Sequence, residues 1–208
     1  MYKFFFRLIF MALILGVNCG FVTVAPVGDP DAISTAANDD RCIAIKHASP
    51  PTAVKVTEIG WYTPSATEEA DYEVGIYNSV GTEPGLIVAG KSAPTAKGTG
   101  TGWKVVTGLN ITISPSTDYW LAVQLDDTLT FTAIDYNGSG GSGRARLDPP
   151  QTELPADWGA SDSRDTNAKM AIYAVWKAVE EPPAESLFMD LSTHLWTLKH
   201  SQGLFTKL

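Results

Sequence analysis

The residues best suited to bind a ligand lie in and beside one long polar stretch, residues 137–168. An aromatic ring presents a flat apolar face that can stack on a sugar ring, and charged neighbours can hydrogen-bond to sugar hydroxyls. Trp158 offers such a ring between Asp157 and Gly159, and packing of Trp158 beneath its own loop is the alternative. Loops of this length in a compact domain are usually functional or disordered. The candidate ligand-binding residues are Trp158, Asp157, Arg144, Arg146, Tyr136 and Arg164.

The sequence carries no recognisable catalytic motif. It contains three histidines and no His-Glu-x-x-His, paired-cysteine or phosphate-binding Gly-Lys-Ser/Thr pattern. The Gly/Ser run at residues 138–143 does not match a nucleophile elbow and is better interpreted as a flexible loop. Paired carboxylates could hydrolyse a glycosidic bond, but spacing singles out no two of the acidic residues. We therefore expect a non-catalytic protein, with a glycoside hydrolase as the less favoured alternative.

No cofactor is expected, and a structural calcium ion is the one metal that we consider. Hard cations bind several oxygen atoms, which could come from Asp126 and Asp127 or from the group Asp157, Asp162 and Asp165. Neither group has the spacing of a known calcium loop, so solvated turn residues are the default interpretation. The net charge of −8 argues against a nucleic-acid partner, because phosphate contacts require clustered Lys and Arg.

Residues 1–25 have the layout of a secretory signal peptide. Lys3 and Arg7 precede an uninterrupted apolar run at residues 8–17, and small residues follow. A signal anchor is the alternative, since the uncharged stretch is roughly long enough to span a membrane. Both interpretations predict an exported protein, secreted or at the cell surface, with membrane contact only through an uncleaved leader. Without the leader Cys42 is a lone cysteine, which we expect to be a buried, small hydrophobic residue.

The elements that must position the candidate residues are β-strands. In residues 117–125, Tyr119, Leu121 and Val123 alternate with Trp120 and Ala122, which is the two-residue period of a strand. Similar runs predict about nine short strands and no helix between residues 41 and 179. We therefore predict an all-β fold, an antiparallel β-sandwich of the jelly-roll type, after a linker at residues 26–40.

The strand patterns also predict local detail. A change of phase within residues 54–62 indicates a bulge near Thr57 and Glu58. Residues 71–77 alternate cleanly, which predicts one face in the core and one in water. The tryptophans that lie within strands are expected to be core residues: Trp61, Trp103, Trp120 and Trp176.

Residues 180–208 are predicted to form a linker and a short amphipathic helix. Leu187, Leu191, Leu195 and Leu198 recur at helical spacing. This tail either folds back on the sandwich or mediates formation of a homo-oligomer.

Four segments resemble a known class of modules. They are residues 72–78 (Tyr-Glu-Val-Gly-Ile-Tyr-Asn), 84–89 (Pro-Gly-Leu-Ile-Val-Ala), 102–103 (Gly-Trp) and 119–123 (Tyr-Trp-Leu-Ala-Val). Together they resemble the jelly-roll β-sandwich modules of secreted bacterial and phage proteins, which look like carbohydrate-binding modules. The resemblance covers residues 41–177 and implies a binding module for a glycan or another cell-surface ligand. The alternative is a structural subunit of a surface layer, filament or virion fibre.

Overall fold

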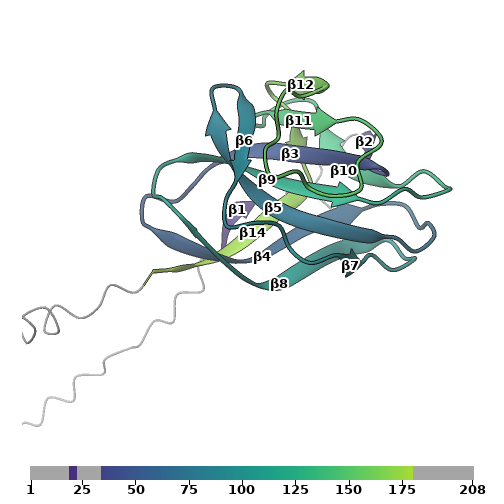
Figure 1. Ribbon diagram of the computed structural model, residues 1–208, viewed down its shortest axis with the longest axis horizontal. Coiled ribbons are helices and arrows are strands. Elements are labelled where there is room, and N and C mark those ends of the chain that lie inside the picture. Colours follow the sequence, from purple (N-terminus) through teal and green to yellow (C-terminus); the bar gives the residue numbers. More distant parts are fainter. Residues whose placement is uncertain (1–18, 23–33, 180–208) are drawn as a thin grey trace, which may run out of the picture. The chain divides into compact units, whose positions relative to one another are not determined.

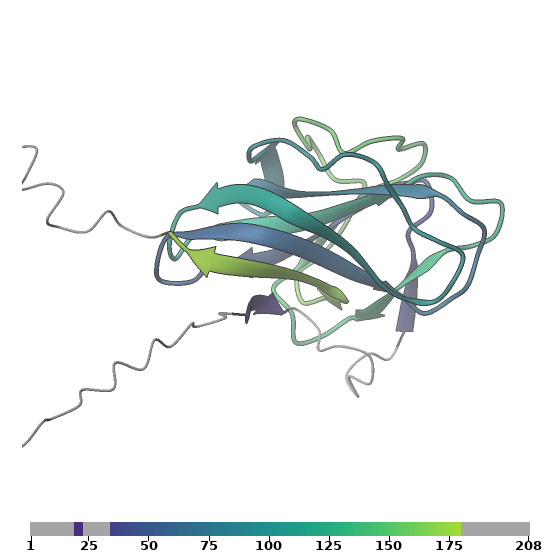
Figure 2. The same cartoon turned by 90° about the horizontal axis from the view of Figure 1, so that it is seen from below.

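The computed structural model describes residues 19–22 and 34–179, and this part of the chain is all-β (Figure 1). The strand ladders are antiparallel, as predicted. Two sheets face each other as a β-sandwich (Figure 2). Within the described residues, no helix is long and apolar enough to cross a membrane.

Three sheets make up the fold. The large sheet has the order β12 (Ser163–Asp165), β11 (Arg144–Leu147), β3 (Arg41–Ala48), β9 (Asp118–Leu125), β5 (Asp71–Val80) and β6 (Glu83–Ile87), with β7 (Thr95–Ala96) also paired to β5. The four-stranded sheet has the order β1 (Cys19–Val22), β14 (Ile172–Ala178), β4 (Val54–Thr63) and β8 (Gly102–Ile113). The small sheet has the order β13 (Lys169–Met170), β10 (Ala133–Asn137) and β2 (Ser34–Ala37). Successive strands β3, β4 and β5 alternate between the two facing sheets of the sandwich.

The main core lies between the large sheet and the four-stranded sheet, and β9 is central to it. This strand pairs with β3 on one side and with β5 on the other. Leu121 and Val123 of β9 are buried in one cluster with Ile43 of β3, Ile76 of β5 and Ile59 of β4. Alternation along the strand sends these side chains to the inner face, where β-branched residues pack well.

The outer face of the large sheet is buried as well. Small side chains at Ala44, Ala122 and Ala145 leave a shallow surface, on which Leu154 and Trp158 pack. Leu154 and Trp158 belong to the segment between β11 and β12, residues 148–162, which we call the cover segment. The fold therefore has a second, smaller core between a sheet and a connecting segment.

The cover segment overturns one prediction for β5. We expected one face of residues 71–77 to lie in water, but Glu73 is only 4% exposed and Tyr77 is fully buried. Alternation in the sequence shows which residues of a strand share a face and how polar that face is. It does not show whether a distant segment of the chain covers that face. The predicted bulge near Thr57 and Glu58 is confirmed, because the register between β4 and β8 shifts between Val56 and Glu58.

The structure has more strands than the sequence predicts. Twelve strands, β3 to β14, lie between Arg41 and Ala178, where we predicted about nine. The additional strands β7, β11 and β12 have two to four residues, too few for alternation to be detected. Part of the predicted linker forms β2, and part of the predicted leader forms β1. The rest of the leader and linker and the predicted C-terminal helix lie outside the described residues.

Candidate ligand-binding face

Trp158, the central candidate in the sequence, is a buried residue. Its side chain is 3% exposed, and its ring meets Tyr77 edge to face, with 5.1 Å between centroids and 84° between planes. The indole Nε1 donates a hydrogen bond of 3.0 Å to Ser161 Oγ. A ring in this position has no open face for a sugar, so the stacking role predicted for Trp158 is wrong and the packing alternative describes it.

Buried polar groups of the large sheet hold the cover segment in place. Glu73 Oε2 accepts a hydrogen bond from the Leu154 backbone N–H at 3.0 Å and forms an ion pair with Lys91 Nζ at 3.0 Å. The hydroxyl of Tyr77 donates to the Pro155 carbonyl at 2.6 Å, and burial raises the pKa of this phenol. The middle of residues 137–168 is thus an ordered part of the fold.

Arg144 and Tyr136 are two candidates that lie in direct contact. The Arg144 guanidinium lies over the Tyr136 ring, 5.4 Å from its centroid. This distance is within the range of a cation–π interaction. The pair links β11 to β10, and both side chains are half-buried.

Arg164 and Trp158 are connected through Ser161, which accepts from Trp158 and donates to the Glu83 carboxylate that pairs with Arg164, whereas Arg146 and Asp157 make other contacts. Arg146 Nε pairs with Asp148 Oδ1 at 2.8 Å, and Arg164 Nε pairs with Glu83 Oε1 at 3.0 Å. Asp157 Oδ1 accepts a hydrogen bond of 3.3 Å from a backbone N–H two residues later. The six predicted residues therefore do not form one site.

The outer face of the four-stranded sheet carries three aromatic rings in contact. The centroids of Tyr62 and Trp103 are 5.5 Å apart with the planes tilted by 60°, and those of Trp103 and Tyr173 are 4.9 Å apart at 69°. All three side chains are half-buried. The hydroxyl of Tyr173 donates a hydrogen bond of 2.6 Å to Glu58 Oε1, which places a carboxylate beside the rings. We call Tyr62, Trp103, Tyr173 and Glu58 the aromatic cluster.

Strand register explains why these rings share one face. Trp61 points into the core, where it is fully buried, so Tyr62 points to the opposite face. Trp103 of β8 pairs with Tyr62, and Tyr173 of β14 pairs with Gly60. A Cβ atom at Gly60 would lie 2.4 Å from the Tyr173 ring, so glycine at this position lets the ring lie over β4.

The prediction that Trp103 is a core residue is wrong. Trp61 and Trp120 are buried as predicted, and Trp176 is partly buried against the main core. Trp103 is instead half-buried in the aromatic cluster, because its pairing with Tyr62 fixes its face. The sequence does contain one indication of this face: Tyr62 directly follows Trp61, so the two rings must point in opposite directions.

A calcium site receives no support from the described residues. They show no group of three or more His, Cys, Asp or Glu side chains that could hold a metal ion. Asp126 Oδ1 accepts a hydrogen bond from Gln124 Nε2 at 3.0 Å, and Asp162 Oδ2 accepts one from the Asp148 backbone N–H at 2.8 Å. Asp165 likewise accepts a backbone N–H from its own turn.

No model of a known protein family matches the chain, and a search of curated proteins finds none that is similar. The function must therefore be argued from the site itself.

Proposed function

We propose that this chain is an exported, non-catalytic module that binds carbohydrate through the aromatic cluster. The observation that carries the proposal is the pair Tyr62 and Trp103, two half-buried rings held 5.5 Å apart on the outer face of a sheet. Such rings offer apolar surface to the faces of a sugar, while the Glu58 carboxylate is an acceptor for sugar hydroxyls. The layout of residues 1–25 supports export.

The tilt between the rings favours one class of carbohydrate. Neighbouring rings of the aromatic cluster are inclined by 60° and 69° to each other, so the three do not form one plane. A flat crystalline polysaccharide surface would require coplanar rings. A single sugar chain or a terminal sugar can meet inclined rings from different sides, so we expect a soluble glycan as the ligand.

A glycan-array screen of the full-length protein beside a Trp103→Ala variant tests the proposal. An aromatic pair contributes roughly 0.5–1.5 kcal/mol beyond the area that it buries. We therefore expect the affinity for the best glycan, measured by isothermal titration calorimetry, to fall by about tenfold. Phe131→Ala is the matched control, since Phe131 is a 56% exposed aromatic residue outside the aromatic cluster. Absence of binding by the intact protein, or equal losses in both variants, contradicts the proposal.

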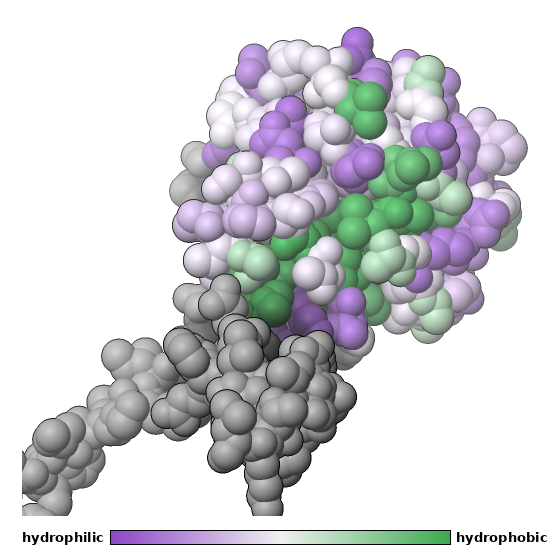
Figure 3. Space-filling model, turned by 60° about the vertical axis from the view of Figure 1, so that its left-hand side comes forward, coloured by the Kyte–Doolittle hydropathy of each residue, from purple (hydrophilic) through white to green (hydrophobic). Residues whose placement is uncertain are grey.

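Assembly into a larger structure is the second candidate function. Figure 3 shows apolar residues gathered on one face of the described chain. Several large hydrophobic side chains are also exposed, among them Leu129 at 98% and Val80 at 62%. Extended apolar surface of this kind marks protein contacts. Concentration-dependent sedimentation of the protein would favour assembly, and a single monomeric species at all concentrations would remove it.

A further inference from the structure

The four-stranded sheet ends in a long strand that has a neighbour on one side only. With 12 residues, β8 is the longest strand that the structure describes, and it pairs with β4 alone. Figure 1 shows β14, β4 and β8 in this order, with β8 at the rim of the sheet. An edge strand presents unpaired backbone N–H and C=O groups, on which another strand can pair. The edge of β8 is therefore a candidate contact surface.

The edges of the large sheet are short or covered. The edge strand β12 has only three residues. On β6, the Ile87 N–H donates a hydrogen bond of 2.9 Å to the Ala156 carbonyl, and the Gly85 carbonyl accepts one of 3.0 Å from the Trp158 N–H. Because Ala156 and Trp158 belong to the cover segment, this segment already serves as the neighbour of β6.

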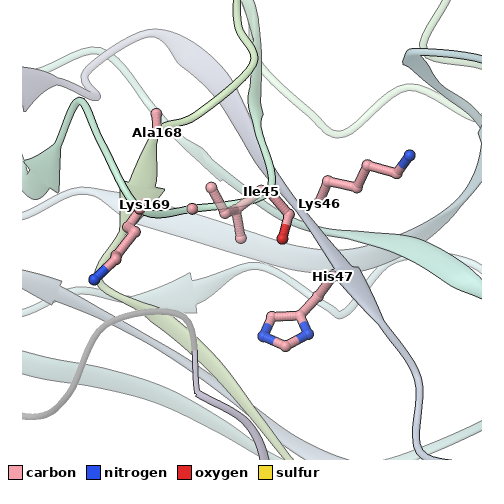
Figure 4. Close-up of a pocket in the computed structure, with 8 residues that line it drawn as sticks. Ile45, Lys46, His47, Ala168 and Lys169 are labelled. Carbon is pink, nitrogen blue, oxygen red and sulfur yellow. The ribbon is translucent and has the colours of Figure 1, made fainter.

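The small sheet also lacks a long edge. β13 has two residues, and β2, at its other edge, has four. A Cβ at Gly141 would lie 1.9 Å from the Ala168 carbonyl oxygen, and the Gly141 N–H donates a hydrogen bond of 2.7 Å to the Asn167 carbonyl. Figure 4 shows Ala168 beside Ile45 of β3, where these segments line a pocket of about 240 Å³. The Gly/Ser run that we interpreted as a flexible loop is thus packed closely against the start of β13.

The hydrogen bonds of β4 show which backbone groups of β8 point outward. The Tyr62 N–H donates a hydrogen bond of 3.0 Å to the Ala171 carbonyl, on the side of β14. Backbone groups of successive residues point to opposite sides of a strand, so those of Trp61 point toward β8, where Trp61 pairs with Lys104. The residues of β8 whose backbone groups point away from β4 are therefore Trp103, Val105 and Thr107. Among the described residues, none forms a hydrogen bond with these outward groups.

This edge has few of the features that prevent strand pairing. Natural proteins protect edge strands with proline, charged side chains or bulges. Residues 103–107 contain no proline, and Lys104 is their only charged residue. The irregular part of β8 begins after Thr107, where the register with β4 shifts and Gly108 has a φ of 75°. Residues 103–107 thus form a regular, open edge.

We propose that β8 pairs with β8 of a second copy of this chain, in an antiparallel dimer centred on Val105. A two-fold axis at this position sets the two Val105 residues opposite each other and sets Trp103 opposite Thr107 of the partner subunit. Cross-strand pairs of β-branched and aromatic side chains stabilise a sheet. Lys104 lies opposite Val106 of the partner subunit, so the two lysines do not face each other. This self-complementary pattern favours a second copy over an unrelated strand.

The dimer joins the two four-stranded sheets into one continuous sheet. Because the two-fold axis is perpendicular to the sheet, both aromatic clusters lie on the same face of it. Dimer formation goes beyond the proposed sugar binding and does not depend on it, so the two proposals can fail separately.

A charge exchange at the axis tests the proposal in the full-length protein. Val105→Glu sets two carboxylates opposite each other, and Val105→Lys sets two ammonium groups opposite each other. Sedimentation velocity over a range of concentrations should show that each variant alone dimerises about five- to tenfold more weakly than the intact protein. An equimolar mixture of the two should dimerise more tightly than either variant alone, because opposite charges then meet at the axis.

A second pair of variants separates the backbone from the side chain. Val105→Pro removes the outward N–H, and proline is tolerated on an edge strand whose N–H faces solvent. Val105→Ala shortens the side chain and retains the N–H. Two hydrogen bonds cross the axis between the Val105 residues, so proline should weaken dimerisation by about fivefold or more relative to alanine.

Leu129→Ser is the control for association through exposed apolar side chains. Leu129 is 98% exposed and lies outside β8, in the loop between β9 and β10. Circular dichroism verifies that each variant is folded. Three outcomes overturn the proposal: an intact protein that is monomeric at all concentrations, a dimer that Leu129→Ser weakens as much as Val105→Glu does, and a mixture of the charged variants that dimerises no more tightly than either alone.

Discussion

At the scale of single residues, Cys42 shows how completely the cover segment buries the outer face of the large sheet. Its side chain is fully buried, and its Sγ lies 3.6 Å from the Glu153 carbonyl oxygen. Burial raises the pKa of the Cys42 thiol to about 12, and the nearby Glu73 carboxylate adds to this effect. The expectation of a buried, small hydrophobic residue is confirmed. Only the thiolate form of cysteine is nucleophilic. Burial keeps reagents away from the Cys42 sulfur, and the raised pKa keeps the thiol protonated.

We therefore predict that Cys42 does not react with a thiol reagent in the native protein. In a Cys19→Ser variant, which leaves Cys42 as the only cysteine, a disulfide reagent at pH 8 should release no chromophore until denaturant is added. After denaturation, one thiol per protein molecule should react at once. The absorbance of the released chromophore gives the rate of the Cys42 reaction directly. Rapid modification in the native state would show that the cover segment opens readily.

At the scale of elements, one carboxylate connects two loops at the end of the sandwich. Glu68, in the loop between β4 and β5, accepts a hydrogen bond of 2.9 Å from the Thr130 backbone N–H and another from the Thr130 hydroxyl. Thr130 lies in the loop between β9 and β10, next to the almost fully exposed Leu129. The hydrogen bonds from Thr130, led by that of its hydroxyl, lower the pKa of Glu68 below its ordinary value of 4.5.

The hydrogen bonds between Glu68 and Thr130 should weaken in acid. The folded state binds the Glu68 proton less tightly than the unfolded chain does, so protonation favours the unfolded chain. The contribution to stability is present above pH 4.5 and is lost as the pH falls through the lowered pKa. We predict that the Thr130 amide resonance shifts in an NMR pH titration with a midpoint below 4.5. This step should be absent in Glu68→Gln and retained in Asp127→Asn, and a midpoint at or above 4.5 contradicts the assignment.

The elements also show what the sequence could and could not predict. Alternation identified the long strands, such as β5 and β9, because a two-residue period is a property of one strand alone. Contacts between distant segments were not predictable. The burial of Glu73 depends on the cover segment, some eighty positions later, and the outward direction of Trp103 depends on its register with Tyr62. For the same reason, the sequence did not predict which contacts the candidate site residues make.

At the scale of the whole molecule, the outer faces of the two sheets differ in what covers them. The cover segment buries the outer face of the large sheet through Leu154 and Trp158. The outer face of the four-stranded sheet carries the aromatic cluster, whose rings are half-buried. One tryptophan therefore contributes mainly to stability, and the other is proposed to contribute mainly to binding.

Exchanging each tryptophan for alanine should separate these two roles. Trp158→Ala removes a side chain that is 3% exposed and leaves a cavity, so we predict a loss of about 3–5 kcal/mol in the free energy of unfolding. The loss is measured by urea denaturation, and glycan affinity per folded molecule should not change. Trp103→Ala should instead reduce the glycan affinity and change the free energy of unfolding little.

Trp158→Phe serves as the test if the alanine variant does not fold. It retains the ring contact with Tyr77 and loses the hydrogen bond to Ser161, so its stability should lie between those of the intact protein and the alanine variant. Reduced glycan affinity in folded Trp158→Phe would mean that the two faces are coupled, because this side chain is too deeply buried to touch a ligand.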